Sequence, residues 1–265
     1  MAILPADDVE FEFSIPVLII GGVACGLVAA LAAHDKGAEV LVLERDPMPS
    51  GSTALSSGMI PAAGTKLQAD AGVEDNPELM ASDVQAKAKD RAVPDIVEAV
   101  CKISGSTINW LVDKHKIELE LVQGFLYPKH SAHRMHAPPS RTGEALIGNL
   151  MEAIGTAGID VMTDAHVTDL FAESDGRIRG LRITRPDEST EIIGCETLIL
   201  ACNGFGGNPE MVRQYIPEMA EAEYFGHTGN QGDAMIWGEA LGGETHHMTA
   251  YQGHGSVAKP HGILI

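Results

Sequence analysis

Three glycines and one glutamate near the N-terminus have the spacing of a dinucleotide site. Gly21, Gly22 and Gly26 follow a short apolar run, and Glu44 ends a second apolar run 18 residues after Gly26. A glycine-rich turn lets backbone N–H groups approach a diphosphate at a helix N-terminus, and an acid about 20 residues later accepts hydrogen bonds from ribose hydroxyls. These residue types at this spacing predict that the chain binds a dinucleotide.

One position departs from this pattern. Val23 stands where the G-x-G-x-x-G motif has its middle glycine. That glycine permits close approach of the backbone to the diphosphate. We therefore expect the Val23 side chain to push the diphosphate away or shift the turn, with partial compensation by Gly22, and to weaken the affinity for the dinucleotide.

The elements that must position these residues form a strand–helix–strand unit. Residues 15–20 and 39–43 are apolar and predict strands, and residues 27–34 are rich in Ala and Leu and predict a helix. A membrane span is the alternative, because residues 13–33 carry no formal charge and match the length of about 20 that a span needs. Paired glycines, Pro16, acidic flanks and the second apolar run favour the nucleotide fold.

The composition limits the partners and the compartment. The 265 residues carry 37 acidic and 18 basic side chains, a net charge of −19, which repels nucleic acids and anionic membranes. Four cysteines lie far apart without a C-x-x-C pair and no signal sequence is recognisable, so we expect reduced thiols in a cytoplasmic protein.

The rest of the chain alternates between helical and strand patterns. Helices are predicted within residues 77–117 and at 142–157. Short strands separated by turns predict a β-meander at residues 161–162, 167–171, 178–183 and 191–193. A compact strand at 197–201 then enters a second glycine turn at 203–207, and a Gly-Asp pair at 232–233 opens a helix through residue 241.

Taken in this order, these features give the chain a family resemblance. A nucleotide-binding unit, a serine-rich glycine loop at 50–58, a meander, a strand ending in Ala-Cys-Asn-Gly-Phe-Gly-Gly and the helix-opening Gly-Asp follow one another. The chain resembles, from Ile15 to Ile265, the FAD-binding flavoproteins that include soluble fumarate reductases, succinate dehydrogenase flavoprotein subunits and 3-ketosteroid dehydrogenases. The resemblance implies an α/β, Rossmann-like FAD-binding domain over 14–248, a parallel sheet with a β-meander. It also implies that 249–265 is only the start of a truncated substrate-capping domain.

The resemblance also implies which residues hold FAD. The residues at the pyrophosphate and the adenosine ribose are Gly21, Ala24, Cys25, Gly26 and Glu44. Those along the flavin ring and ribityl chain are Ser52, Thr53, Ser57, Gly58 and Met59. Those at the adenine, over the dinucleotide or near it are Val167, Ala201, Asn203, Gly204 and Asp233. Membrane-bound members carry a flavin-linked histidine where this chain has Ser52, so we expect non-covalent FAD.

On the substrate side, the resemblance points to one histidine. His254 lies in a segment similar to the Gln-Ala-His-Pro-Thr of family reductases, where a histidine binds a carboxylate or carbonyl and polarises the adjacent double bond. A surface histidine in a glycine-rich loop is the simpler interpretation, and Tyr251 is an alternative proton donor. Arg134 is a candidate oxyanion partner, although an exposed ion pair is its simpler use.

Three further histidines invite a metal hypothesis. His130, His133 and His136 lie three residues apart, but 130–136 holds no Asp, Glu or Cys, and Pro138 and Pro139 favour a loop. We therefore expect no metal site.

The function implied by the resemblance is that of an FAD-dependent oxidoreductase. It transfers a hydride between flavin N5 and an activated carbon–carbon bond of a small fumarate-like or enone substrate, and it needs an electron donor or acceptor that the sequence does not identify. The chain lacks the C-terminal half of the family pattern, so by itself it is a candidate for an inactive enzyme. The alternatives are a non-catalytic FAD- or nucleotide-binding remnant, a subunit of a split enzyme, and, disfavoured by the later motifs, a nicotinamide-dependent dehydrogenase.

Overall fold

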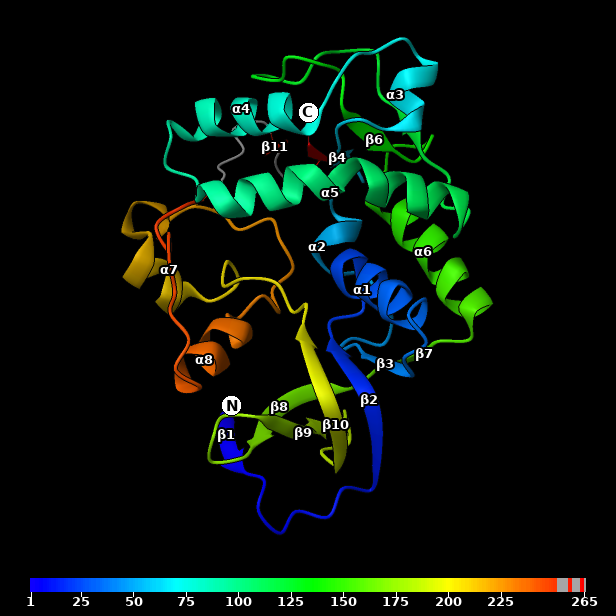
Figure 1. Cartoon of the computed structure of the whole chain (residues 1–265). Helices are drawn as coiled ribbons and strands as arrows, with labels where there is room; N and C mark the ends of the chain where they lie inside the picture. Colours follow the sequence, from blue (N-terminus) through cyan, green and yellow to red (C-terminus); the bar gives the residue numbers. More distant parts are fainter. Residues whose placement is uncertain (252–256, 259–262, 265) are drawn as a thin grey trace. The chain divides into compact units, whose positions relative to one another are not determined.

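The computed structural model describes residues 1–251, 257–258 and 263–264. The chain divides into two compact units (Figure 1). Met1–Leu55 and Ile154–Ile265 form the first unit, and Ser56–Ala153 form the second. The predicted boundary between residues 248 and 249 stays a prediction.

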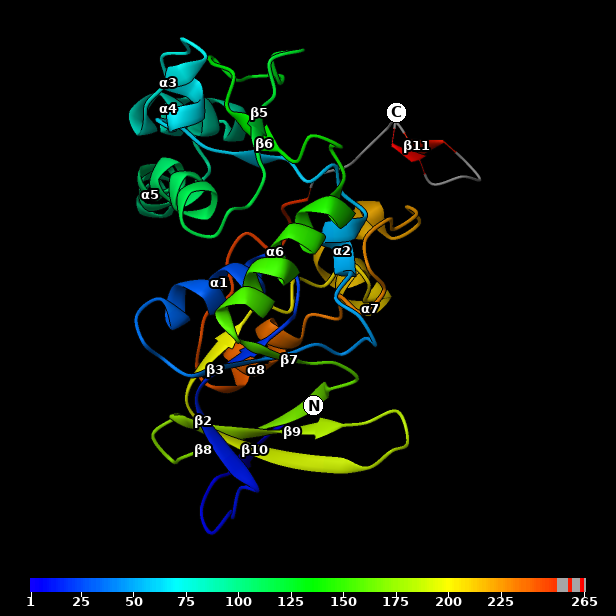
Figure 2. The same ribbon diagram turned by 90° about the vertical axis from the view of Figure 1, so that its right-hand side faces the viewer.

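A seven-stranded sheet organises the first unit. Its strand order is β1-β8-β9-β10-β2-β3-β7. The strands are β1 (Ala2–Pro5), β2 (Phe13–Ile20), β3 (Val40–Leu43), β7 (Asp160–Met162), β8 (His166–Ala172), β9 (Ile178–Thr184) and β10 (Thr190–Leu200). The strands β10, β2, β3 and β7 are parallel, whereas β8, β9 and β10 are antiparallel neighbours (Figure 2). The predicted α/β class, with a parallel sheet and a β-meander, is confirmed.

Strand β10 joins the two halves of this sheet. The sequence predicts two separate strands here, and this prediction is wrong, because residues 190–200 are one strand that pairs with β9 along its first part and with β2 from Ile193 onward. Gly194 is closely packed within this strand: a Cβ atom on it would lie 2.2 Å from Ser14 Oγ. The assignment of residues 161–162 to the meander is also wrong, since they form β7 at the opposite edge of the sheet.

The first unit contains four α-helices and one short 3-10 helix among its described residues. Helix α1 (Ala24–His34) packs on β2 and β3 (Figure 1). The other helices are α2 (Gly51–Ala54), α7 (Pro209–Tyr215), α8 (Asp233–Ala240) and the short 3-10 helix η1 (Pro217–Met219). Leu18 and Trp237 are buried in one apolar cluster with strands of the meander, so α8 is anchored in the core of this unit.

The second unit is mostly helical. Its helices are α3 (Lys66–Asp70), α4 (Pro77–Ala88) and α5 (Pro94–Asp113), and its small sheet has the order β4 (Ile60–Pro61), β6 (Met135–Ala137), β5 (Glu120–Leu121). Prolines stand in the first turn of α4 and α5, as predicted, because a missing N–H costs nothing there. Helix α6 (Gly143–Ala157) leads the chain back to the first unit, to which β11 (Val257–Ala258) and its partner β12 (Ile263–Leu264) also belong.

Residues 13–33 do not form one continuous helix. They comprise β2, a glycine turn and most of α1. In the part of the chain that the structure describes, every helix is too short or too polar to cross a membrane.

Candidate dinucleotide site

The glycine turn between β2 and α1 is packed so closely that side chains are excluded. Gly21 has φ +111° and donates its N–H to the Leu43 carbonyl at 2.8 Å. A Cβ atom on Gly21 would lie 2.4 Å from the Ala201 carbonyl oxygen, and one on Gly26 would lie 1.8 Å from the Gly21 carbonyl oxygen. These two positions require glycine, which brings the backbones of β2, α1 and the end of β10 together.

Glu44 is fixed against this turn from the end of β3. The residue is 8% exposed, and its Oε2 accepts the Gly22 N–H at 2.9 Å while Oε1 accepts the Asp46 N–H at 3.1 Å. A carboxylate offers about four lone-pair positions, so acceptor capacity is left for a ligand hydroxyl. Glu44 lies beside the glycine turn. Its predicted role at the adenosine ribose stays a prediction.

Val23 occupies the N-cap of α1 without backbone strain. Its φ of −114° and ψ of −165° are extended values open to any residue. Its Cγ1 would lie 3.0 Å from a Cβ atom on Gly51, so the missing side chain of Gly51 makes room for the valine. The predicted effect of Val23 on the affinity stays a prediction.

The start of α1 suits an anion. No side chain caps its N-terminus, and no acidic residue stands in its first turn. Backbone N–H groups in a first helical turn have no partner within the helix, and the helix dipole favours negative charge there. A diphosphate fits this donor set.

One pocket brings seven of the fifteen predicted cofactor residues together. It is lined by Ile20, Gly21, Val23, Leu43, Glu44, Arg45, Asp46, Gly51, Ser52, Ala165, His166, Val167, Ala201, Cys202, Asn203, His227, Gly229, Asn230 and Asp233. Seven of the predicted residues are in this set: Gly21, Glu44, Ser52, Val167, Ala201, Asn203 and Asp233. The pocket therefore collects the carboxyl ends of β2, β3 and β10, where ligands of parallel sheets bind.

Other predicted residues lie elsewhere. Ala24, Cys25, Gly26, Thr53 and Gly204 belong to the same unit but do not line the pocket, and Cys25 is exposed. The predicted flavin-side residues of the second unit, Ser57, Gly58 and Met59, stay a prediction. His254 lies outside the described residues.

Asp233 is a partly buried acid with one oxygen that is not hydrogen-bonded. In the described part of the chain its Oδ1 is inaccessible to solvent and has no hydrogen-bond partner. Burial raises the pKa of Asp233, and the nearby His166 and Arg45 offset that rise only in part. Burial likewise raises the pKa of the neighbouring Cys202 thiol to about 11, so this thiol stays protonated at neutral pH.

Three residues that the sequence did not single out complete the pocket wall. Arg45 donates to the Gly229 carbonyl at 3.1 Å and contacts His227 Nδ1 at 3.2 Å. Asn230 donates to Ser52 Oγ at 2.9 Å. The only sequence signals were the position of Arg45 next to Glu44 and the position of the other two just before the Gly-Asp pair.

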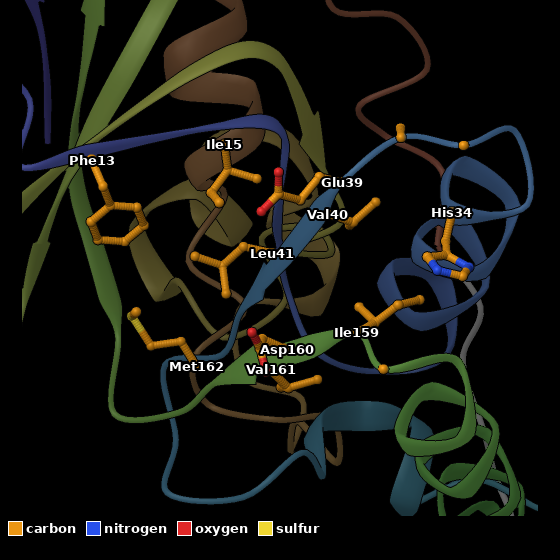
Figure 3. A pocket seen from close by; sticks show the side chains of 13 residues that line it. Phe13, Ile15, His34, Glu39, Val40, Leu41, Ile159, Asp160, Val161 and Met162 are labelled. Atoms are coloured by element: carbon orange, nitrogen blue, oxygen red, sulfur yellow. The ribbon is translucent and has the colours of Figure 1, made fainter.

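A separate cavity opens at the other ends of the parallel strands. Figure 3 shows Phe13, Ile15, Leu41 and Met162 around it, with the carboxylates of Glu39 and Asp160 at the starts of β3 and β7. It contains none of the predicted cofactor residues.

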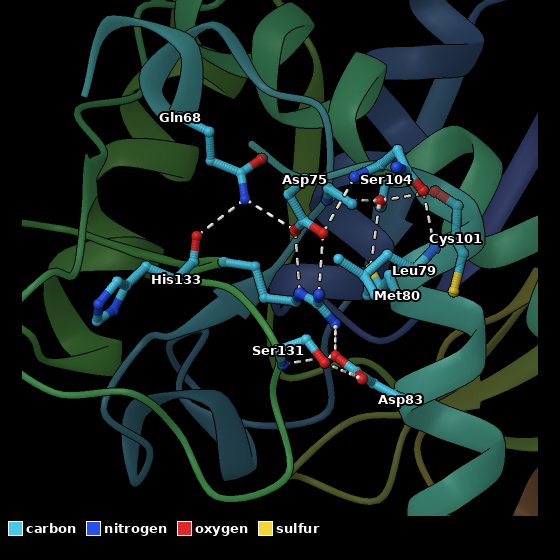
Figure 4. Close-up of polar contacts among 12 residues, drawn as sticks. Gln68, Asp75, Leu79, Met80, Asp83, Cys101, Ser104, Ser131 and His133 are labelled. Atoms are coloured by element: carbon cyan, nitrogen blue, oxygen red, sulfur yellow. Dashed lines mark hydrogen bonds and ion pairs between the residues drawn. The ribbon is translucent and has the colours of Figure 1, made fainter. Parts of the chain in front are cut away.

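Arg134 is not available to a substrate. It is 1% exposed, its Nε and Nη2 donate to the two oxygens of Asp75 at 3.0 and 2.9 Å, and its Nη1 donates to Asp83 at 2.7 Å. Gln68 also donates to Asp75, and Ser131 donates to Asp83 (Figure 4). Both interpretations of Arg134, an oxyanion partner and an exposed ion pair, are therefore wrong.

His136, a member of the histidine series, is a core residue. It is fully buried, with Nε2 2.9 Å from Thr65 Oγ1 and Nδ1 3.0 Å from the Arg134 carbonyl. Both ring nitrogens therefore have hydrogen-bond partners inside the second unit.

Comparison with known proteins decides the family. The family described as "FAD binding domain" matches residues 16–265. The chain belongs to this family. Membership confirms the resemblance and identifies FAD as the cofactor. The glycine turn, the uncapped start of α1, the spare lone pairs of Glu44 and the unpaired oxygen of Asp233 fit that ligand.

Relatives of this FAD-binding chain are named as reductases. An NADH:fumarate oxidoreductase of Klebsiella pneumoniae is 28% identical over 256 residues, which cover 95% of this chain and 27% of the relative. A urocanate reductase of Eggerthella lenta is 29% identical over 86% of this chain and 38% of the relative. The chain thus spans well under half the length of these relatives.

Solved structures share the fold. A flavocytochrome c3 fumarate reductase matches with a TM-score of 0.81 and 25% identity, over 88% of this chain and 41% of that one. A 3-ketosteroid-Δ4-(5α)-dehydrogenase of Rhodococcus jostii RHA1 matches with a TM-score of 0.82 and 23% identity, over 94% and 58% of the two chains.

Proposed function

We propose that this chain is the FAD-binding part of an oxidoreductase that reduces or forms an activated carbon–carbon double bond in a small substrate. The observation that carries the proposal is Glu44: its buried carboxylate is hydrogen-bonded to the glycine turn in a chain whose family binds FAD. FAD supplies the hydride chemistry when bound, and the protein supplies binding and orientation.

The residues of the pocket divide this work. The uncapped start of α1 offers N–H donors to the diphosphate, and Glu44 offers acceptors to the adenosine ribose. Asp233 offers an oxygen that has no hydrogen-bond partner in the described chain, in a carboxyl group whose pKa burial raises.

The substrate class is an α,β-unsaturated carboxylate. Relatives are named for the reduction of fumarate, urocanate and acrylate, which share a double bond conjugated to a carboxylate. We infer that this chain acts in the same direction, with His254 as the substrate-binding histidine. An enone remains the second substrate type, because a solved structure of the same fold is a ketosteroid dehydrogenase.

FAD is held without a covalent bond in this proposal. A flavin-linked histidine would stand at Ser52, and a serine hydroxyl has no imidazole nitrogen to form that link. Ser52 Oγ instead accepts the His227 N–H at 3.0 Å and the Asn230 side-chain amide at 2.9 Å.

Turnover with an artificial electron donor tests the proposal. We would load the protein with FAD, supply reduced viologen dye, and follow its oxidation with fumarate, urocanate, acrylate and an enone. Oxidation of the dye that depends on an unsaturated carboxylate is expected, and a saturated carboxylate such as succinate is the control substrate. Tight FAD binding without oxidation of the dye in the presence of any alkene would favour the second candidate, an FAD-binding unit without activity of its own. The observation behind this candidate is that the chain covers only 27% of the length of a relative.

A further inference from the structure

The turn from His227 to Asn230 is fastened to the segment that follows Glu44. Arg45 Nη1 donates to the Gly229 carbonyl at 3.1 Å, and Arg45 Nη2 lies 3.2 Å from His227 Nδ1. His227 Nε2 lies 3.1 Å from Asp46 Oδ2, and its backbone N–H donates to Ser52 Oγ. We call Arg45, Asp46, His227 and Gly229 the arginine clamp.

Hydrogen bonding assigns one protonation state to the imidazole in this clamp. Nδ1 of His227 faces two donors, Arg45 Nη2 and the Gly229 N–H, both at 3.2 Å. A nitrogen between two donors must present its lone pair, so the hydrogen resides on Nε2 and points to Asp46. A neutral His227 therefore acts with the Gly229 carbonyl and with Asp46 Oδ1, which lies 3.4 Å from Arg45 Nε, to hold the guanidinium in one orientation.

Gly229 lets the guanidinium lie flat on the turn. A Cβ atom at this position would lie 1.5 Å from Arg45 Nη2 and 2.0 Å from Cζ. Any larger residue would displace the guanidinium, because the tip of the arginine is the part able to move. Glycine here serves the arginine rather than a special backbone angle.

The orientation of Arg45 matters because the other charged groups that line the pocket are carboxyl groups. Glu44, Asp46 and Asp233 line it with three carboxyl groups, and Arg45 is the one Lys or Arg side chain among its lining residues. The clamp leaves Arg45 31% exposed rather than buried, so the side chain stays accessible. A dianionic diphosphate entering such a pocket needs a compensating cation.

We propose that Arg45 provides the compensating charge for the diphosphate of FAD and that His227 is the positioning residue that aims it. This inference rests on FAD as the ligand of the pocket. In this proposal the diphosphate is bound by the backbone of the glycine turn and also by the Arg45 side chain. The position of Arg45 depends on the neutral imidazole of His227 as an acceptor and on the absence of a side chain at Gly229.

Titration of FAD into four variants tests the clamp, with flavin fluorescence as the readout and ionic strength as a second variable. Arg45→Met is expected to weaken FAD binding at least about tenfold, the size of one charge-assisted hydrogen bond, and to flatten its dependence on salt. His227→Leu and Gly229→Ala are expected to weaken binding in the same direction because they release Arg45. His227→Asn is expected to restore most of the affinity, since an amide oxygen near the Nδ1 position accepts from Arg45.

A matched control and two measurements keep the outcomes distinct. Arg179→Met removes another partly exposed arginine of the first unit, paired with Glu173, and should leave FAD binding unchanged. Thermal unfolding without FAD identifies variants that merely lose stability, and Arg45→Lys, which keeps a charge but not the fork, replaces Arg45→Met if the latter is unstable. Wild-type affinity and salt dependence in Arg45→Met would overturn the proposal, as would equal weakness of His227→Asn and His227→Leu. Failure of the wild-type protein to bind FAD at all would instead count against the pocket as a whole.

Discussion

Arg134 in the second unit and Asp233 Oδ1 in the first are both polar groups inaccessible to solvent, and their hydrogen bonding differs. The Arg134 guanidinium meets two carboxylates, Asp75 and Asp83, that also accept from Gln68 and Ser131. Asp233 Oδ1 has no hydrogen-bond partner in the described chain. Buried polar groups are almost always paired within the protein or with a ligand.

This difference distinguishes a cluster that stabilises the fold from residues that can bind a ligand. Where every charge is paired internally, as around Arg134, the cluster holds segments of the second unit together and has nothing left for a ligand. At Glu44 and Asp233, beside glycine turns, acceptor capacity is left that the described chain does not use, and we propose that FAD uses it. The predictions below change one side of this comparison at a time.

Loss of the guanidinium should produce the largest effect on stability. Arg134→Met would leave Asp75 and Asp83 buried without their cation, which costs about 3–5 kcal/mol. Chemical denaturation measures the free energy of unfolding, and Arg179→Met, a partly exposed arginine, should cost no more than about 1 kcal/mol. Equal effects of the two variants would mean that the Arg134 cluster is not a structural support.

A methyl group in the glycine turn should have an intermediate effect on stability. Gly26→Ala puts a Cβ atom 1.8 Å from the Gly21 carbonyl oxygen, so the turn must open at a cost of about 1–3 kcal/mol. Gly148→Ala in α6 is the matched control: its Cβ meets open space, and alanine should stabilise the helix by about 0.5–1 kcal/mol. A Gly26→Ala protein with unchanged stability and FAD affinity would show that the turn is looser than described.

The two acids should respond to pH in opposite directions, with the smallest effects. Burial raises the pKa of Asp83, but hydrogen bonds from Ser131 and the charge of Arg134 outweigh this and lower it overall. Its ionised form therefore stabilises the fold at neutral pH, and this contribution is lost as the pH falls through the lowered pKa. The pKa of Asp233 is raised, so its ionisation costs stability as the pH rises from the unfolded value through the folded one.

Variants of Asp83 and Asp233 test the two directions of pH dependence. Asp83→Asn should be less stable than the wild type at neutral pH, and Asp233→Asn should be more stable. Both differences should shrink toward the acidic end of the titration. The measurement is denaturant unfolding without FAD from pH 3 to 8, and slopes of the same sign for both variants would contradict the comparison.

Local patterns made the nucleotide-binding core predictable. Gly21, Gly26 and Glu44 lie within one strand–helix–strand unit, where spacing along the chain determines proximity. The sequence predicts two strands in place of β10 because Gly194 follows the first apolar run, although this glycine pairs with both Gly180 of β9 and Ser14 of β2.

Long-range pairings account for most of what the sequence could not predict. Arg134 is 59 residues from Asp75 and 51 from Asp83, so nothing in its own segment indicates that it is buried. Arg45 is separated by 182 residues from His227. Edge strand β7 pairs with β3, which is more than 100 residues earlier in the chain, and not with the strand that follows it. The turns next to residues 160–162 therefore do not indicate the partner of this strand.

Equilibrium binding of FAD to the wild-type protein and to Glu44→Gln tests the central claim most directly. The account predicts one FAD per chain, retained through desalting, and an affinity at least about tenfold lower in Glu44→Gln, whose amide group removes an acceptor beside Gly22. Circular dichroism would verify that both proteins are folded. A folded wild-type protein that binds no FAD, or a Glu44→Gln protein that binds it as tightly as the wild type, would contradict the account.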